Sequence, residues 1–186
     1  AATNTFLTTI APTTAATTTI TLPIGDASGT FPITAVDDLV DDGTQTVTIS
    51  ATFTGFVTGS DTVDVTDDDT RGVTITPTAG LITTEAGGTD SFTVVLDTEP
   101  TSNVTIGFSS SDTGEGDVDK SSLTFSTTDW FTPQTIVVSG ADDALADGDV
   151  AYSIVSAAAS GGDYAGLDAA DVGVTNLDDD NPALTL

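Results

Sequence analysis

Residues 134–148 read QTIVVSGADDALADG, and this stretch decides the fold. It opens with alternating polar and apolar side chains and runs into a loop of the pattern D-D-x-x-x-D-G. Alternation with period two places every second side chain on one face of an extended chain, as in a β-strand with one face on a core. The glycine suits a tight turn, and residues 149–155 form a second candidate strand. The stretch therefore predicts two strands joined by an acidic loop.

The same pattern occurs earlier, where residues 30–43 read TFPITAVDDLVDDG. Each copy is followed by further candidate strands and then by three consecutive aspartates, at residues 67–69 and at residues 178–180. An internal repeat of this length indicates repeated structural modules. The repeat predicts a first module at residues 1–69, a second at residues 70–180, and the opening strand of a following module, or a donor strand, at residues 181–186.

The composition favours β-structure throughout. Hydrophobic residues make up 38% of the 186 residues, the mean hydropathy is +0.14, and Thr, Val, Ile and Phe are residues that suit a pleated sheet. Seven short strands in about 100 residues are typical of an immunoglobulin-like sandwich. In the second module we expect strands at residues 72–76, 91–96, 103–109, 123–125, 134–139, 149–155 and 171–176. In the first we expect them at residues 5–10, 17–22, 30–36, 44–53 and 61–65.

The predicted fold class is therefore all-β, with two tandem immunoglobulin-like antiparallel β-sandwiches, the first lacking its opening strands. A sandwich without edge strands exposes core side chains and unpaired backbone. Residues 183–186 of another copy are one candidate to fill that gap by strand addition, which predicts a homopolymer assembled head to tail. The alternative is that the chain is a stretch of a longer array of such modules. The sequence leaves both open.

The charge excludes several classes of function. The chain has 29 acidic and 2 basic residues, a formal net charge of −27, and neither His nor Cys. A chain this negative repels nucleic acid and anionic membranes, and no apolar run approaches the roughly 18 residues of a membrane span. Without His or Cys, the usual zinc ligands, the commonest general base (His) and the strongest nucleophile (Cys) are missing. We therefore expect no enzyme, no nucleic-acid partner and no membrane insertion.

The aspartates gather where a sandwich would bring them together. In such a fold the acidic loop and the end of the last strand lie at the same pole, so each module collects six or more carboxylates in a small volume. Carboxylates this close repel one another, and a bound cation removes the repulsion. Many oxygen ligands without nitrogen or sulfur suit Ca²⁺ best. The alternative is a solvated acidic surface, which would spread Asp over the strand faces, where Thr and Ser stand instead.

The D-D-x-x-x-D-G loops, the closing aspartate runs and the segment that starts with Glu85 (EAGG) resemble the Calx-β family in its bacterial surface-protein form. Residues 123–140 (LTFSTTDWFTPQTIVVSG) are similar to repeats of large secreted bacterial proteins. The resemblance implies calcium binding at one pole of each sandwich. The implied ligands of the second module are Glu85, Asp117, Asp142, Asp143, Asp147, Asp178, Asp179 and Asp180. Those of the first module are Asp37, Asp38, Asp42, Asp67, Asp68 and Asp69, without a counterpart of Glu85.

These expectations favour a structural role. The chain would be a calcium-stiffened extracellular module of a bacterial surface fibre, adhesin stalk or filament, whose partners are neighbouring modules of the same or identical chains. The alternative is an adhesive, lectin-like module. Binding tips usually carry long aromatic-rich loops, whereas the longest loops expected here, residues 80–90 and 157–170, are rich in Gly, Ala and Ser. Trp130 and Phe131 form the one aromatic pair, and we expect packing rather than sugar binding from it.

Overall fold

The structure is a computed structural model that describes residues 2–9, 15–22, 28–52 and 57–181. The chain divides into two compact units, Ala1–Asp69 and Thr70–Leu186, here called the first and the second unit. The described residues form strands, loops and one 3₁₀ turn, η1 (Gly162–Tyr164), so the prediction of an all-β chain is confirmed. The predicted opening or donor strand lies almost wholly in residues 182–186, outside the described residues.

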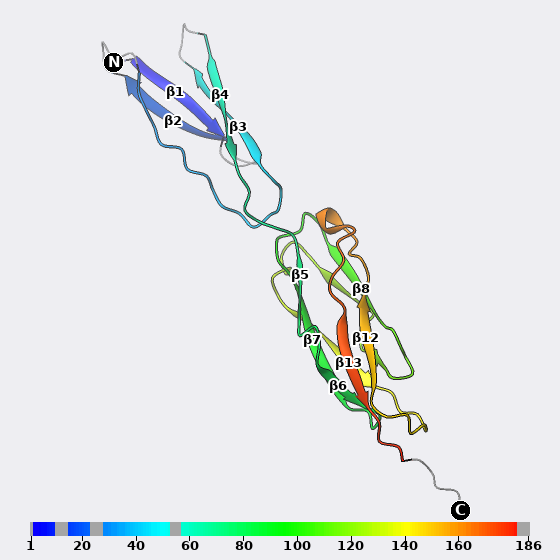
Figure 1. Cartoon of the computed structure of the whole chain (residues 1–186). Coiled ribbons are helices and arrows are strands. Elements are labelled where there is room, and N and C mark those ends of the chain that lie inside the picture. The colour runs from blue at the N-terminus through cyan, green and yellow to red at the C-terminus, as the bar shows by residue number, and fades with distance from the viewer. Residues whose placement is uncertain (1, 10–14, 23–27, 53–56, 182–186) are drawn as a thin grey trace, which may run out of the picture. The chain divides into compact units, whose positions relative to one another are not determined.

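The second unit is a sandwich of two sheets (Figure 1). Its strands are β5 (Val73–Thr76), β6 (Leu81–Thr84), β7 (Thr89–Leu96), β8 (Val104–Ser110), β9 (Gly116–Val118), β10 (Ser122–Phe125), β11 (Gln134–Gly140), β12 (Val150–Ser156) and β13 (Val172–Leu177). One sheet has the order β10-β8-β12-β13-β6 and the other the order β5-β7-β11-β9. Neighbouring strands run antiparallel, with the exception of β13 and β6, which run parallel.

The core of the second unit lies between these two sheets. Every second side chain of β7 and of β8 is buried, among them Phe92 and Phe108. Their rings meet across the core with centroids 5.8 Å apart, edge to face. Tyr164, from η1, is fully buried, and its hydroxyl donates to the carbonyl oxygen of Thr98 at 3.0 Å. The period-two alternation read from the sequence therefore does bury one face of each main strand.

All seven strands predicted in the second module are present within one or two residues, but two more were not predicted. These are β6 and β9, both in segments that the sequence indicated as loops. In β6 Leu81 and Thr83 are buried, whereas Ile82 is 52% exposed. A buried threonine beside an exposed isoleucine breaks the alternation of apolar and polar residues, so the sequence does not reveal the strand.

The first unit contributes one sheet of the order β2-β1-β3-β4. Its strands are β1 (Ala2–Thr9), β2 (Ala15–Leu22), β3 (Gln45–Thr52) and β4 (Gly59–Val65). None of residues 28–52 and 57–69 is fully buried. Val47 and Ile49 of β3 alternate with exposed threonines but remain half-buried. The described part of this unit therefore has the inner face of a sandwich without a second sheet packed on it.

The strand predicted at residues 30–36 is wrong, because these residues adopt no regular structure. In the repeat they correspond to β11, which pairs with β7 on one side and β9 on the other. No counterpart of β7 or β9 occurs among the described residues of the first unit. A strand is stabilised by the ladder that it forms with a neighbour, so the alternating sequence alone does not produce one here.

Candidate metal centres

Both units fold the acidic loop in the same way. The backbone N–H of Gly43 donates to Asp67 Oδ2 at 2.6 Å, and the N–H of Gly148 donates to Asp178 Oδ2 at 2.7 Å. The two glycines have φ angles of 73° and 83°, a conformation that other residues rarely adopt. In each unit the loop is therefore fastened to the first aspartate of the closing run by the same bond.

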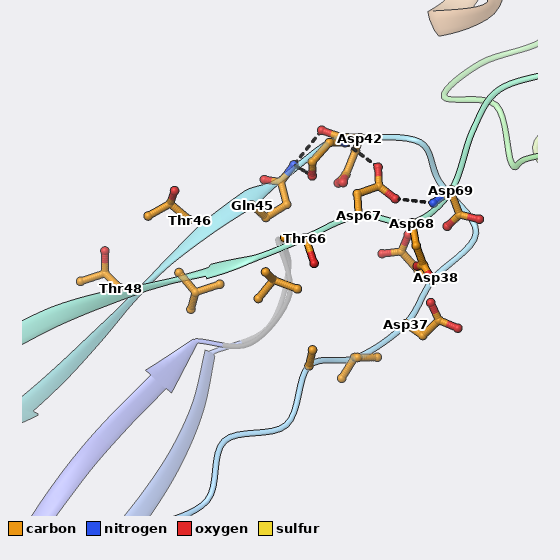
Figure 2. A pocket seen from close by; sticks show the side chains of 15 residues that line it. Asp37, Asp38, Asp42, Gln45, Thr46, Thr48, Thr66, Asp67, Asp68 and Asp69 are labelled. Atoms are coloured by element: carbon orange, nitrogen blue, oxygen red, sulfur yellow. Dashed lines mark hydrogen bonds between the residues drawn. The ribbon is translucent and has the colours of Figure 1, made fainter.

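A second hydrogen bond, which also occurs in both units, bends the chain within the run of closing aspartates. The N–H of Asp69 donates to Asp67 Oδ1 at 2.9 Å, and the N–H of Asp180 donates to Asp178 Oδ1 at 2.7 Å. Figure 2 shows both Asp67 bonds in the first unit. Because these bonds bend the chain at the end of the last strand, the other carboxylates of the run gather beside the loop.

Three groups of carboxylates form where β6 and β13 end and β12 begins. In each group, one oxygen from every residue lies within 4.8 Å of the others. The groups are Glu85, Asp142 and Asp179; Glu85, Asp178 and Asp180; and Glu115, Asp143 and Asp147. Two oxygens on opposite sides of a calcium ion lie about 4.6–5.2 Å apart, given Ca–O distances of about 2.3–2.6 Å. The spacing of all three groups therefore fits Ca²⁺.

Glu85 is the carboxylate that two of these groups share. Its residue is 3% exposed, and its Oε2 accepts a hydrogen bond from the N–H of Asp179 at 3.4 Å. Burial raises the pKa of Glu85; the bond from Asp179 opposes this shift, whereas the charges of Asp178, Asp143 and Asp180 add to it. A buried acid surrounded by acids is unfavourable in its ionised form unless a cation compensates it.

Asp180 is a second carboxylate whose charge is not compensated by the described residues around it. Its Oδ2 is buried and has no hydrogen-bond partner among the described residues. Burial raises the pKa of Asp180, and the charges of Asp178, Asp179 and two aspartates of the loop raise it further. Asp119 shows the contrast, because the ammonium of Lys120 donates to its Oδ2 at 2.9 Å and this bond lowers the pKa of Asp119.

Glu115 joins the third group through a buried polar network. The residue is 7% exposed, and Asn176 Nδ2 donates to its Oε2 at 3.4 Å and to the carbonyl oxygen of Ala141 at 3.1 Å. Asn176 Oδ1 in turn accepts from the hydroxyl of Thr83 at 2.9 Å. The hydrogen bond from Asn176 holds the side chain of Glu115 in place, with a carboxylate oxygen close to those of Asp143 and Asp147.

Asp117, which the resemblance implied as a ligand, lies outside these groups. It stands exposed on β9, and its Oδ1 accepts from the N–H of Val118 at 2.8 Å. Glu115 is the nearby acid that the structure brings to the loop. Neighbouring positions in an extended chain point to opposite sides, but the sequence does not reveal where β9 begins, so it does not decide which acid of this segment turns inward.

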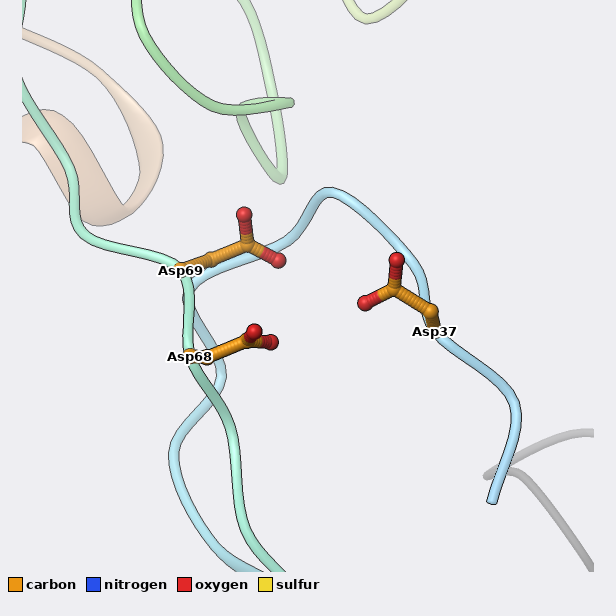
Figure 3. A group of neighbouring side chains, drawn as sticks. All are labelled: Asp37, Asp68 and Asp69. Atoms are coloured by element: carbon orange, nitrogen blue, oxygen red, sulfur yellow. The ribbon is translucent and has the colours of Figure 1, made fainter. Parts of the chain in front are cut away.

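Among its described residues, the first unit gathers one group of three carboxylates, Asp37, Asp68 and Asp69. Figure 3 shows these side chains converging from the loop and from the closing run. Burial raises the pKa of Asp69, and the negative charges of Asp67, Asp37, Asp68 and Asp38 add to the shift. No counterparts of Glu85 and Glu115 occur in this unit, because residues 1–69 contain no glutamate.

Beside this group lies a hollow of about 590 Å³ (Figure 2). Its walls combine the apolar side chains of Ala35, Val36, Val47 and Val65 with an acidic rim. The rim holds the remaining predicted ligands of the first unit, Asp38, Asp42 and Asp67, together with Asp37, Asp68 and Asp69. Of the predicted residues, the structure thus collects ten in the four groups, places Asp38, Asp42 and Asp67 beside one group, and leaves Asp117 apart.

Comparisons with known proteins give a weak likeness in structure. No family model matches the chain, and no curated protein matches it significantly. The apo form of the Calx CBD1 domain is 18% identical with a TM-score of 0.45, over 58% of this chain and 96% of its own. The calcium binding domain CBD12 of CALX1.1 is 16% identical with a TM-score of 0.40, over 85% and 68%.

Domains 4 and 5 of the S-layer protein SbsC are 14% identical with a TM-score of 0.42, over 94% of this chain and 70% of their own. Likenesses at this level of identity and TM-score do not assign the chain to a family. Across the described residues, no helix has the length and apolar character needed to cross a bilayer.

Proposed function

We propose that the chain is a structural module that binds Ca²⁺ at the acidic end of its second unit. The observation that carries the proposal is Glu85, a carboxylate that is 3% exposed and nevertheless belongs to two separate groups of acids. Such a residue is unfavourable in the metal-free fold, because burial and three neighbouring charges oppose its ionisation. A cation that bridges the two groups turns this repulsion into attraction.

The chemistry of the donors favours calcium over other ions. All ligands are carboxylate oxygens, which select hard cations, and the chain contains no His or Cys for zinc or copper. Calcium accepts six to eight oxygens in irregular geometry, whereas Mg²⁺ requires a strict octahedron and keeps its water. With 2 basic residues against 29 acidic ones, the chain cannot neutralise these groups internally.

Calcium would join parts of the chain that are far apart in sequence. Glu85 follows β6, Glu115 precedes β9, residues 142–147 form the loop before β12, and residues 178–180 follow β13. An ion held by these segments binds the folded state and not the unfolded one, in which the ligands are scattered. Occupancy would therefore stabilise the sandwich and stiffen the end of β13.

A role outside the cell is part of the proposal. Calcium sites of extracellular modules have Kd values of about 10⁻⁴–10⁻³ M, and calcium reaches such concentrations outside cells. We propose a spacer or stalk of a surface fibre, array or filament, without catalytic activity. Head-to-tail assembly through residues 183–186 remains a proposal from the sequence. A sugar-binding surface is less supported, because Trp130 is 8% exposed and packs edge to face on Phe131, which leaves Phe131, at 61%, as the one exposed ring of the pair.

Isothermal titration with CaCl₂ and, separately, MgCl₂ tests the proposal. We expect saturable calcium binding with more than one ion per chain at submillimolar to millimolar concentrations, and clearly weaker magnesium binding. Glu85→Gln should weaken this calcium binding. Glu99→Gln is the matched control and should not, because Glu99 lies outside the four acidic groups. If the heats of titration show no saturation up to about 10 mM calcium, the proposal is wrong and the acidic groups form a solvated surface.

A further inference from the structure

One buried amide, that of Asn176 in β13, lies among the four segments that carry the acids of the second unit. Asn176 is 1% exposed, and its Nδ2 donates to the carbonyl oxygen of Ala141 at 3.1 Å and to Glu115 Oε2 at 3.4 Å. Ala141 is the residue before the acidic loop, and Glu115 belongs to the third group. On β13 itself, Asn176 stands two residues before Asp178. A single side chain thus connects three of the four segments.

The fourth segment, at the end of β6, reaches the same amide through Thr83. The hydroxyl of Thr83 donates to Asn176 Oδ1 at 2.9 Å, and Thr83 is fully buried. The two residues lie opposite each other in the parallel pair of β6 and β13. Glu85 follows two residues after Thr83, and its N–H donates to the carbonyl oxygen of Leu177 at 3.1 Å. Every segment that carries an acid of the second unit's groups is therefore connected to Asn176, directly or through one residue.

The partners of Asn176 leave its amide one orientation. A carbonyl oxygen only accepts hydrogen bonds, and so does an ionised carboxylate, so the atom that faces Ala141 and Glu115 is the amide nitrogen. The reversed amide would set oxygen against oxygen at both partners. Because the hydroxyl of Thr83 donates its proton to Oδ1, it accepts from the hydroxyl of Tyr152, whose oxygen lies 3.3 Å away. The bonds therefore run in one direction, from the core to the acids.

Two glycines allow the backbone to close around this network. A Cβ on Gly140 would overlap with Asn176 Oδ1 and with the carbonyl oxygen of Thr84. A Cβ on Gly116 would overlap with the hydroxyl oxygen of Tyr152. Glycine is the residue that permits such a close approach. The ends of β6, β9 and β11 thus lie closer to these bonds than any side chain at the two positions would allow.

We infer that Asn176 is the positioning residue of the calcium site. Its Oδ1 faces Thr83 and not the acids, so it acts through Glu115 and Ala141 and not as a ligand. The amide holds Glu115 and the start of the acidic loop in the arrangement that calcium requires, and Thr83 keeps the amide turned the right way. Partners behind the ligands strengthen metal binding because they fix the ligands before the ion arrives. This inference rests on the proposed function.

Loss of the amide should weaken calcium binding beyond any effect on folding. Asn176→Asp keeps the shape of the side chain but replaces the donating N–H group by an oxygen, which faces the oxygens of Glu115 and Ala141. We expect isothermal titration to give a calcium Kd about 10–100 times that of the parent chain. Thr83→Val removes the hydroxyl that orients the amide and touches no acid. It should raise Kd by a smaller factor, roughly threefold to tenfold.

Thr98→Val is the matched control for Thr83→Val. Thr98 is 2% exposed, and its hydroxyl oxygen lies 2.8 Å from that of Tyr164, so this variant also removes a buried bond between a threonine and a tyrosine. Thr98 follows the end of β7, whereas the start of β7 pairs with the end of β11, next to the acidic loop. Thr98→Val should lower Tm equally in calcium and in EDTA and leave Kd unchanged. Circular dichroism verifies the fold of each variant.

The position of the amide can also be measured without calcium. In ¹H–¹⁵N spectra recorded in EDTA, the Nδ2 protons of Asn176 should exchange with water far more slowly than those of Asn103, which is exposed. Burial and hydrogen bonding are the reasons for this protection. Thr83→Val should speed the exchange at Asn176, and Thr98→Val should not.

Four results would overturn the inference. An unchanged Kd in both Asn176→Asp and Thr83→Val would show that the network only stabilises the fold. Tighter calcium binding by Asn176→Asp would mean that position 176 supplies a ligand. Equally fast exchange at Asn176 and Asn103 would show that the amide is not held. A parent chain that binds no calcium would refute the proposed function and this inference with it, whereas unchanged variants of a parent chain that binds calcium refute this inference alone.

Discussion

Glu85→Gln should change stability in one direction in EDTA and in the other in calcium, which a simple loss of packing would not do. In EDTA the variant should be as stable as the parent chain or more stable. Glutamine has nearly the same volume as glutamate, and it removes a charge that Asp178, Asp143 and Asp180 repel. In calcium the variant should be clearly less stable than the parent chain, because two acidic groups lose the same ligand.

The magnitude follows from mass action. At a calcium concentration of about 100 times Kd, binding stabilises the folded state by about 2.7 kcal/mol. If the loss of one ligand weakens binding by about 100-fold, the stabilisation falls to about 0.4 kcal/mol, which is RT ln 2. For a unit of this size each kcal/mol corresponds to roughly 3–5 °C in Tm, so the loss is about 7–12 °C.

Differential scanning calorimetry in calcium and in EDTA measures both changes, with Glu99→Gln as the control for an isosteric Glu-to-Gln change. The control should retain the calcium-dependent rise in Tm. The reasoning would be refuted if Glu85→Gln lowered Tm equally in both buffers, since Glu85 would then be a packing residue. It would also fail if the rise in calcium persisted in the variant.

Three further predictions concern pH, ligand choice and the core. Because the folded pKa values of Glu85, Asp180 and Asp69 are raised, they favour the fold at low pH and lose this effect as pH rises through the folded pKa. In EDTA Tm should therefore fall as pH rises above about 4, the ordinary pKa of a carboxyl group, whereas calcium should reverse the slope, as thermal melts at a series of pH values will show. Glu115→Gln should weaken calcium binding about tenfold or more by calorimetric titration, and Asp117→Asn should leave it unchanged. Phe108→Ala should cost about 3–5 kcal/mol in urea unfolding, because Phe108 is 4% exposed and packs on Phe92.

The main strands could be predicted from the sequence because each is a half-buried segment with strict alternation. The strand β12 is an example, with Tyr152 and Ile154 inside and Val155 outside. The strand β6 could not, because Ile82 faces water and Thr83 faces the core. Thr83 is buried since it contacts Tyr152 and Asn176, residues about 70 and 90 positions away. Only the folded chain shows that such partners exist.

The acidic loops were predictable because the repeat aligns them, and both copies do make the same bonds from Gly43 and Gly148. The choice of Glu115 over Asp117 was not, because it depends on where the three-residue strand β9 begins, and Glu115 lies just before that strand. Residues 30–36 show the converse error. Their alternation is typical of a strand, but a strand needs a neighbour, and the described part of the first unit provides none.

A calcium titration followed by ¹H–¹⁵N NMR tests the central claim most directly. The amides of Gly148, Asp179 and Asp180 donate to carboxylates of the second unit's groups. In the first unit the amides of Gly43 and Asp69 donate to Asp67, which lies beside that unit's group. We predict that the second set of groups saturates at a lower calcium concentration, because it has Glu85 and Glu115 and the first does not. Small, unsaturable shifts spread over all exposed aspartates would contradict the account.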